Sequence, residues 1–324
     1  MTAQVRFIDA ISEGLRTAMD ADDAVVIIGE DVTFGGPFGA TKGLVEEFGS
    51  GRVRDTPISE ATVMGVAIGA ALSGLRPVVE IMFIDFITLA MDQLVNHAAK
   101  FHFMTGGQLT VPLTLRVQGG INGRFGAHHS QSLESWLVHT PGLKVVAPAF
   151  PGDARRLLQA AIKDDNPVVF IEHRGLYWMK GPLGGTDPTS GALVRREGTD
   201  VTIISYSKML HAALSAADTL DAAGVAAEVV DLRWLSPLDL DTVVGSVRKT
   251  GRAIIAHEAV TQGGVGAELV ASIQTAAFEN LVAPIERVGA PFAPIGASPE
   301  LEDAFSPRAE DIVEAALRTM KRGD

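Results

Sequence analysis

The sequence predicts two doubly wound α/β domains, each built on a mostly parallel sheet with helices on both faces. Short β-branched runs alternate with stretches of helical periodicity along most of the chain. The alternation stops between residues 181 and 196, where Gly and Pro are frequent, and then starts again. A chain of 324 residues is also long for one hydrophobic core. We therefore expect a first domain at 1–180, a linker at 181–196 and a second domain at 197–324.

The first domain is predicted from periodicity and turn residues. Apolar residues between Phe7 and Met19 recur at helical spacing and precede a buried strand at 25–28. The glycine-rich loop at 35–39 is not a dinucleotide-binding fingerprint, because Pro37 interrupts it and no helix begins at its glycines. The further elements expected here are helix 60–75, strand 77–83, helix 84–103, strand 112–117, strand 143–147, helix 153–162 and strand 167–171.

The second domain repeats the same alternation. We expect strand 200–206, helix 209–223, strand 226–232, helix 238–249, strand 252–257, a helix reaching residue 278 and a final helix at 308–320. The glycine cluster at 263–266 follows a strand and opens a helix, as a phosphate-binding turn does. Its third glycine is missing, so close packing of the helix is the preferred explanation.

Composition and charge exclude several classes of function. The net charge of -12 disfavours binding to nucleic acid or to an anionic membrane. The absence of cysteine excludes disulfides, iron–sulfur clusters, thiolate zinc sites and a cysteine nucleophile. The longest apolar run, 61–75, is shorter than the ~20 residues that a membrane span needs. Because no secretory signal is recognisable at the start, we expect a cytoplasmic protein.

The helix predicted at 60–75 has three notable features. Ser59 is placed to cap it, and from spacing alone the favoured role of Glu60 is to complement the helix dipole. The helix is apolar nearly all round, which predicts burial on every side. Gly65 and Gly69 share one face and would let another backbone approach closely, either within the domain or across a subunit contact.

The loop at 119–132 is the most polar and glycine-rich of the first half. Its adjacent His128 and His129 would point apart and chelate one metal poorly, so an acid–base or hydrogen-bonding role suits them better. From the residues alone, a solvent-exposed pair is an equal alternative. No H-E-x-x-H pair, G-x-S-x-G elbow or P-loop lysine motif is present, which argues against a zinc protease, an α/β-hydrolase and a nucleotide hydrolase.

Several segments of the chain occur together and in a characteristic order. They are Gly29–Val32, Asp55–Glu60, Gly74–Pro77, Ala127–Gln131, Pro141–Val146 and Asp164–Val168, followed by 231–233, 237–239 and 257–259. The set closely resembles the beta subunit of the thiamine-diphosphate-dependent decarboxylating component of 2-oxo acid dehydrogenase complexes, over nearly the whole chain. The resemblance implies a domain that binds the cofactor's pyrimidine, followed by a domain like the C-terminal domain of transketolase.

The resemblance also implies roles for individual residues. Glu60 would share a proton with a pyrimidine nitrogen and so activate the cofactor. Phe86 would stack on the aminopyrimidine, although an ordinary core Phe is the plainer alternative. His129, rather than His128, would lie near the substrate carboxylate and the lipoyl arm.

Further site residues follow from the same likeness. Glu30 and Ile58 lie in matching segments and are implied to bind the cofactor. A potassium site, built largely from backbone carbonyls, would map to Leu113, Ala161, Ile162, Asp164 and Asn166.

One absence predicts the quaternary structure. Enzymes of this class hold the diphosphate and its Mg²⁺ through a Gly-Asp-Gly segment and paired asparagines, and this chain has neither. We therefore expect Mg²⁺ on an alpha subunit, activity only with that subunit, and an α2β2 heterotetramer. The second domain would serve assembly and docking of the lipoyl acyltransferase core.

The resemblance implies decarboxylation of a pyruvate-like or branched-chain 2-oxo acid and transfer of the acyl group to a lipoyl domain. Residues 82–86 are at least as similar to acetoin-cleaving relatives, so an acetoin dehydrogenase beta subunit, cleaving a hydroxyketone, is the alternative. A nicotinamide dehydrogenase would need a complete glycine fingerprint after its first strand. A non-catalytic assembly subunit would not need Glu60, Phe86 and His129 together.

Overall fold

The computed structural model describes residues 4–185 and 187–321, and the chain divides into two compact units. The first contains 1–119 and 136–189, and the second contains 120–135 and 190–324. The predicted division at 180 and 196 did not anticipate that the segment 120–135 packs with the second unit. Ile121 explains this packing, because its side chain belongs to a buried apolar cluster with Ala290, Ile295 and Phe305 of that unit.

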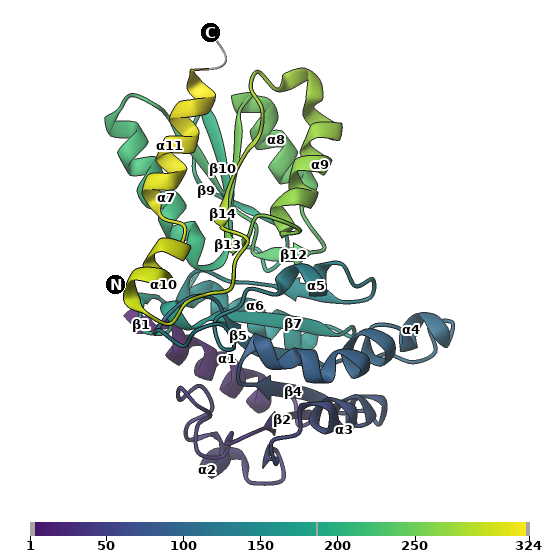
Figure 1. Cartoon of the computed structure of the whole chain (residues 1–324). Coiled ribbons are helices and arrows are strands. Elements are labelled where there is room, and N and C mark those ends of the chain that lie inside the picture. Colours follow the sequence, from purple (N-terminus) through teal and green to yellow (C-terminus); the bar gives the residue numbers. More distant parts are fainter. Residues whose placement is uncertain (1–3, 186, 322–324) are drawn as a thin grey trace. The chain divides into compact units, whose positions relative to one another are not determined.

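The first unit is built on a parallel sheet, coloured purple to teal in Figure 1. Its strands have the order β6-β7-β5-β4-β2-β3, and every one of these neighbouring pairs is parallel. They are β2 (Val25–Gly29), β3 (Val53–Asp55), β4 (Arg76–Ile81), β5 (Thr114–Gly119), β6 (Lys144–Val146) and β7 (Val168–His173). A separate antiparallel pair joins β1 (Gln4–Arg6) to β8 (Lys180–Pro182). Strands β2, β5 and β7 are buried along their whole length, as their apolar runs predict.

Helices cover this sheet. They include α1 (Phe7–Ala21), α2 (Leu44–Phe48), α3 (Glu60–Leu72) and α6 (Pro151–Lys163). The short η3 (Arg174–Leu176) follows β7, and α5 (Glu134–Val138) begins in the segment 120–135 and ends in the first unit. Helix α1 packs against α6, and its apolar positions recur at helical spacing on the buried side. Helix α2 was not expected from the sequence.

The single helix predicted at 84–103 is wrong. The chain forms instead a 3₁₀ helix η1 (Ile84–Ala90), a π-helical segment η2 (Gln93–Ala98) and a short α4 (Phe101–Met104). The reason lies in the spacing of the buried side chains. Ile84, Ile87 and Ala90 recur every three residues, which matches the 3₁₀ repeat, whereas Leu94 and Ala98 follow at intervals of four.

Helix α3 is buried on one face only, so the prediction of burial on every side is wrong for the single chain. The face with Met64 and Ile68 is buried, whereas Val66 is 57% exposed and both Gly65 and Gly69 are exposed. A Cβ built on Gly69 would meet nothing within 4 Å, and one on Gly65 would meet only a side-chain carbon at 4.0 Å. The close backbone approach that these glycines permit is therefore not used within the described part of the chain.

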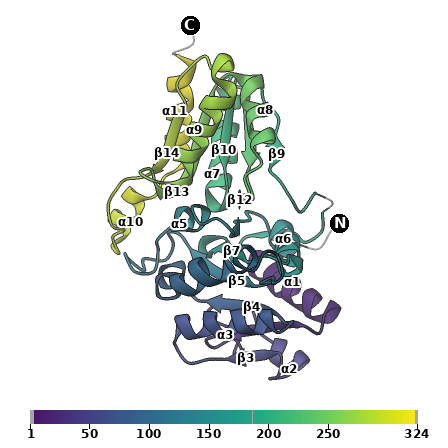
Figure 2. The same ribbon diagram turned by 90° about the vertical axis from the view of Figure 1, so that its right-hand side faces the viewer.

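The second unit has its own, mixed sheet, coloured teal to yellow-green in Figures 1 and 2. The strand order is β14-β13-β10-β11-β9, and only the edge strand β9 pairs antiparallel. The strands are β9 (Leu193–Arg196), β10 (Val201–Ser205), β11 (Ala227–Asp231), β13 (Ala253–Val260) and β14 (Glu286–Ala290). The short strand β12 (Trp234–Ser236) is not part of this sheet. Together with the first unit, this mixed sheet confirms the predicted class of two α/β domains with mostly parallel sheets.

The helices of the second unit form two pairs. Helix α7 (Ser207–Ala222) packs against α11 (Ala309–Met320), and α8 (Leu240–Thr250) packs against α9 (Val265–Ala277). Figure 1 shows one pair on each side of the sheet. The sequence patterns predicted these four helices, whereas η4 (Phe278–Asn280), α10 (Pro299–Phe305) and strands β9, β12 and β14 were not expected.

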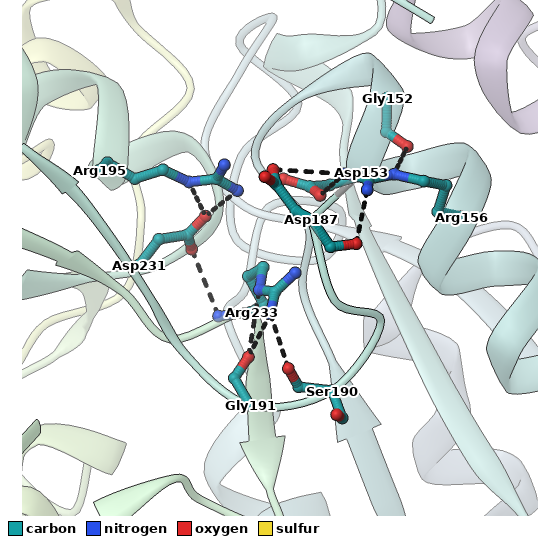
Figure 3. Close-up of polar contacts among 9 residues, drawn as sticks. All are labelled: Gly152, Asp153, Arg156, Asp187, Ser190, Gly191, Arg195, Asp231 and Arg233. Atoms are coloured by element: carbon teal, nitrogen blue, oxygen red, sulfur yellow. Dashed lines mark hydrogen bonds and ion pairs between the residues drawn. The ribbon is translucent and has the colours of Figure 1, made fainter. Parts of the chain in front are cut away.

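The connection predicted at 181–196 is fixed to each unit by an arginine. Within the first unit, Arg156 donates to the carbonyl of Asp187 at 2.7 Å and to the carboxylate of Asp153 at 2.7 Å. Within the second, the fully buried Arg233 donates to the carbonyls of Ser190 and Gly191 at 2.8 Å each (Figure 3). Because a guanidinium carries five N–H donors, one side chain satisfies several backbone carbonyls at once.

No helix among the described residues is long and apolar enough to cross a membrane.

Candidate functional site

A cavity lies at the carboxyl ends of β2 and β4 and at the start of α3. Its walls include Glu30, Thr56, Glu60, Glu80, Met82 and Phe86. In open α/β sheets, ligands bind outside the carboxyl ends of the strands. Three carboxyl groups and one aromatic ring therefore share the position at which this fold binds ligands.

The turn after β3 places Glu60 at the edge of the cavity. The amide of Thr56 donates to the carbonyl of Gly29 at 3.0 Å, which ties the turn to β2. The predicted cap by Ser59 is wrong, because its hydroxyl donates to the Pro57 carbonyl at 3.1 Å and accepts nothing from the helix. Glu60 is the first residue of α3 and half-buried, so its carboxylate lies at the positive end of the helix.

Two other predicted residues lie in the same cavity. Burial raises the pKa of Glu30, and the charges of Asp31 and Glu60 raise it further. The ring of Phe86 packs edge-on against Phe83, with their centroids 5.7 Å apart and an interplanar angle of 73°. An aromatic ring and carboxyl groups of this kind suit a flat heterocycle with ring nitrogens.

Thr56 adds a polar group that the sequence reasoning did not single out. Its hydroxyl is buried at the cavity wall, and no hydrogen-bond partner for it is found among the described residues. A buried hydroxyl without a partner is costly, which fits a site that takes a polar ligand. Ile58, in contrast, is 74% exposed and does not line this cavity, so the structure does not bring it together with Glu60, Glu30 and Phe86.

His129 belongs to the segment 120–135 and so to the second unit. Its ring lies 6.4 Å from that of Phe125, with an interplanar angle of 40°. His129 is half-buried and His128 is exposed. The neighbouring Ser130 is fully buried, and its hydroxyl has no partner among the described residues.

Polar side chains of the second unit hold this histidine segment in place. Glu258 accepts the amide of Ile121 at 3.0 Å, and Lys208 donates to the Ile121 carbonyl at 3.0 Å. At the other end of the segment, Tyr206 donates to the carboxylate of Glu134 at 2.6 Å. Sequence reasoning includes Glu258 only within the segment 257–259, and it misses Lys208, Tyr206 and Glu134 because these residues meet only in the folded unit.

The carbonyls predicted to bind potassium are partly engaged by the protein itself. Arg76 donates from one guanidinium nitrogen to the carbonyls of Ile162, at 3.1 Å, and Asp164, at 3.2 Å. The Leu113 carbonyl accepts the amide of Val168 at 2.9 Å. Each carbonyl keeps a second lone pair, so these bonds leave acceptor capacity for a cation. The described residues hold no cluster of three or more His, Asp or Glu side chains that could bind a metal ion.

Two family models together match most of the chain. Residues 3–179 match the family model "Transketolase, pyrimidine binding domain", and residues 190–312 match "Transketolase, C-terminal domain". Every side chain described above as lining the cavity therefore falls within the first of these two matches.

Two relatives have nearly the same length. The chain is 44% identical over 328 residues to the acetoin:2,6-dichlorophenolindophenol oxidoreductase subunit beta of Cupriavidus necator, which covers 97% of each protein. It is 43% identical over 324 residues to the pyruvate dehydrogenase E1 component subunit beta of Bacillus subtilis, which covers 98% of this chain and 99% of the relative. A solved structure described as a split gene transketolase, inactive beta4 tetramer, has a TM-score of 0.80 over 99% of both chains; at 23% identity it supports the fold alone.

Proposed function

Because this chain belongs to the transketolase-like family of thiamine-diphosphate enzymes, and within it to the pyruvate and acetoin dehydrogenase beta subunits, we propose that it is the beta subunit of a two-chain dehydrogenase of this kind. Its reaction is decarboxylation of a pyruvate-like or branched-chain 2-oxo acid, followed by transfer of the acyl group to a lipoyl domain. The observation that carries the proposal is the cavity that brings Glu60, Glu30 and Phe86 together inside the matched pyrimidine-binding domain.

The cavity residues would hold the pyrimidine half of the cofactor. When bound, thiamine diphosphate supplies a carbon nucleophile and accepts the electrons released when the bond next to the substrate carbonyl breaks. Glu60 would hold a proton at its carboxylate or give it up to a ring nitrogen of the cofactor. Phe86 offers a face or edge to the ring, and the free hydroxyl of Thr56 offers a hydrogen bond. These contacts orient the ring, which is the larger part of the protein's task.

His129 would act on the substrate side of the same reaction. An imidazole exchanges protons near neutral pH, so it suits a position near a substrate carboxylate and an incoming acyl acceptor. The anchoring of 120–135 by Glu258, Lys208 and Glu134 supports this role, because a general acid or base must be held in place to be effective.

The diphosphate half of the site would come from an alpha subunit, which would also carry Mg²⁺. The absence of Gly-Asp-Gly and of paired asparagines supports this division. The exposed face of α3, with Gly65, Val66 and Gly69, supports an α2β2 assembly, because it is apolar and uncovered in the single chain. Docking of a lipoyl acyltransferase core and a cytoplasmic location remain parts of the proposal.

Acetoin is the second candidate substrate, because relatives named for acetoin and for pyruvate are equally similar to the chain. The test is to reconstitute this chain with an alpha-type chain that carries the missing motifs and to supply pyruvate, a branched-chain 2-oxo acid or acetoin, with a lipoyl domain as acceptor. Turnover of a 2-oxo acid with release of carbon dioxide is expected. Turnover of acetoin alone would select the alternative, and no thiamine-dependent turnover of any of the three would contradict both.

A further inference from the structure

A row of three charged side chains crosses the sheet of the first unit behind the cavity. Glu80 on β4 pairs in register with Arg116 on β5, and Arg116 pairs in register with Glu172 on β7. Side chains at paired positions of neighbouring parallel strands point to the same face of the sheet. All three are nearly buried, with 9%, 3% and 1% of the side chain exposed.

The two carboxylates of the row are bonded unequally. Arg116 forms two bonds to Glu172, at 2.7 and 3.0 Å, and Tyr177 donates a third at 2.7 Å. Both oxygens of Glu172 are therefore satisfied by the protein. Glu80 receives one bond only, from Arg116 to Oε2 at 2.6 Å, and among the described residues no donor bonds to its Oε1.

Glu80 lines two cavities. One contains Glu60 and Phe86, and the other is lined by Gln118 and by Arg116 and Glu172 of the same row. A Cβ built on Gly36, where φ is +66°, would stand 2.5 Å from Oε1, so the glycine loop passes directly over this oxygen. In the second of these cavities, Gln118 is 4% exposed, and its own side-chain oxygen has no partner among the described residues.

The charge balance of the row makes Glu80 responsive to its surroundings. Two carboxylates face one guanidinium, so the row has one acid more than it can neutralise. Burial raises the pKa of Glu80 and the charge of Glu172 adds to this, while Arg116 lowers the pKa. A hydrogen-bond donor that enters the cavity would stabilise the charged form, because a donor favours an ionised acceptor.

We propose that Glu80 is a positioning residue of the cofactor site. One of its carboxylate oxygens is fixed by Arg116, and the other accepts a hydrogen bond from a donor bound beside the cofactor ring, either an N–H group or a water molecule. This inference rests on the proposed function and deepens it. Glu80 acts through that donor and does not touch the reacting atoms. Glu172, in the same row and on the same arginine, has no open oxygen, so its role is confined to holding the row together.

The test compares Glu80→Gln with Glu172→Gln in the chain reconstituted with its alpha subunit. Each variant keeps the size of the side chain and removes one charge from the row, so loss of thermal stability is expected in both. Only Glu80→Gln should raise the KM for thiamine diphosphate, by ~10-fold. Only this variant should also shift the acid limb of the pH profile of kcat/KM. Glu172→Gln should keep the KM within about twofold of wild type and leave the acid limb in place.

A third variant, Glu80→Asp, keeps the charge and withdraws the open oxygen from the cavity. It should raise the KM and leave the acid limb in place. Equal effects of Glu80→Gln and Glu172→Gln on the KM and on the pH profile would overturn the proposal. Wild-type values in Glu80→Gln would also overturn it. If Glu80→Gln does not fold, a wild-type KM in Glu80→Asp would do the same. A wild-type pair without thiamine-dependent turnover would instead refute the proposed function and this inference with it.

Discussion

Two charged clusters, one in each unit, are bonded differently. In the second unit, Glu258 accepts the amide of Ile121, Lys208 donates to the Ile121 carbonyl, and the two side chains form an ion pair, so these charges fix a loop. In the first unit, Glu80 lines two cavities, and no donor among the described residues bonds to its Oε1. Charges that are fully satisfied within a unit hold its shape, whereas a carboxylate left open at a cavity prepares the unit for a ligand.

The largest effect is expected at the cavity of the first unit. Glu60→Gln removes the proton-sharing carboxylate and should lower turnover of the reconstituted enzyme by ~10²–10⁴-fold. The measurement is kcat with saturating cofactor and substrate. The control is Glu46→Gln, an exposed acid in the first turn of α2, which should keep wild-type activity. Turnover of Glu60→Gln within a few-fold of wild type would remove Glu60 from the site.

The next effect concerns the loop that the second unit holds. His129→Ala should slow acyl transfer to a lipoyl domain by ~10²-fold, because the transfer loses its acid–base group. The adjacent and exposed His128 supplies the control, since His128→Ala should leave the rate nearly unchanged. Stopped-flow measurement of acyl transfer separates the two. Equal rates in both variants would remove the proposed role of His129.

A pH effect on stability is expected in the second unit. Burial lowers the pKa of His257 to about 4, from its ordinary value near 6.5. The unfolded chain therefore takes up the proton first, so the stability that neutral His257 contributes is present above pH 6.5 and is lost as the pH falls toward 4. The loss is about 3 kcal/mol. Urea unfolding of wild type and His257→Gln between pH 7 and pH 4 should show this dependence only in wild type; parallel curves would contradict it.

A smaller effect tests the anchor of the histidine loop. Tyr206→Phe removes the hydrogen bond to the buried Glu134 and should lower the free energy of unfolding by ~1–3 kcal/mol. Burial raises the pKa of Glu134, and the hydrogen bond from Tyr206 opposes that rise. Without this bond, the folded state holds the proton of Glu134 more tightly, so the variant should lose less stability at pH 5 than at pH 7. Urea midpoints at pH 5 and pH 7 measure both. A variant as stable as wild type at both pH values would show that this bond does not hold the loop.

The smallest effect concerns the predicted cation site. Arg76 already donates to the carbonyls of Ile162 and Asp164. Replacing Na⁺ by K⁺ should therefore raise the melting temperature by only a few degrees, which corresponds to ~1 kcal/mol in the free energy of unfolding. Arg76→Gln should increase the difference between the two ions. Identical melting curves in both salts, for wild type and variant alike, would argue against a potassium site at these carbonyls.

The sequence predicted those parts of the molecule that depend on local pattern. The strands at 25–28 and 167–171 and most long helices follow from periodicity, and Glu60, Glu30 and Phe86 lie together as the motif comparison implied. The row Glu80–Arg116–Glu172 could not be predicted, because it depends on the register of strands that are far apart in sequence. Likewise, an apolar helix predicts burial but does not say which chain covers it, and α3 leaves one face exposed.

The central claim is that this chain holds only half of a thiamine-diphosphate site. Calorimetric titration of thiamine diphosphate with Mg²⁺ into the isolated chain, and into the chain reconstituted with its alpha subunit, tests it most directly. We expect weak, Mg²⁺-independent binding by the isolated chain and tight, Mg²⁺-dependent binding by the pair. Tight, Mg²⁺-dependent binding by the isolated chain would contradict it.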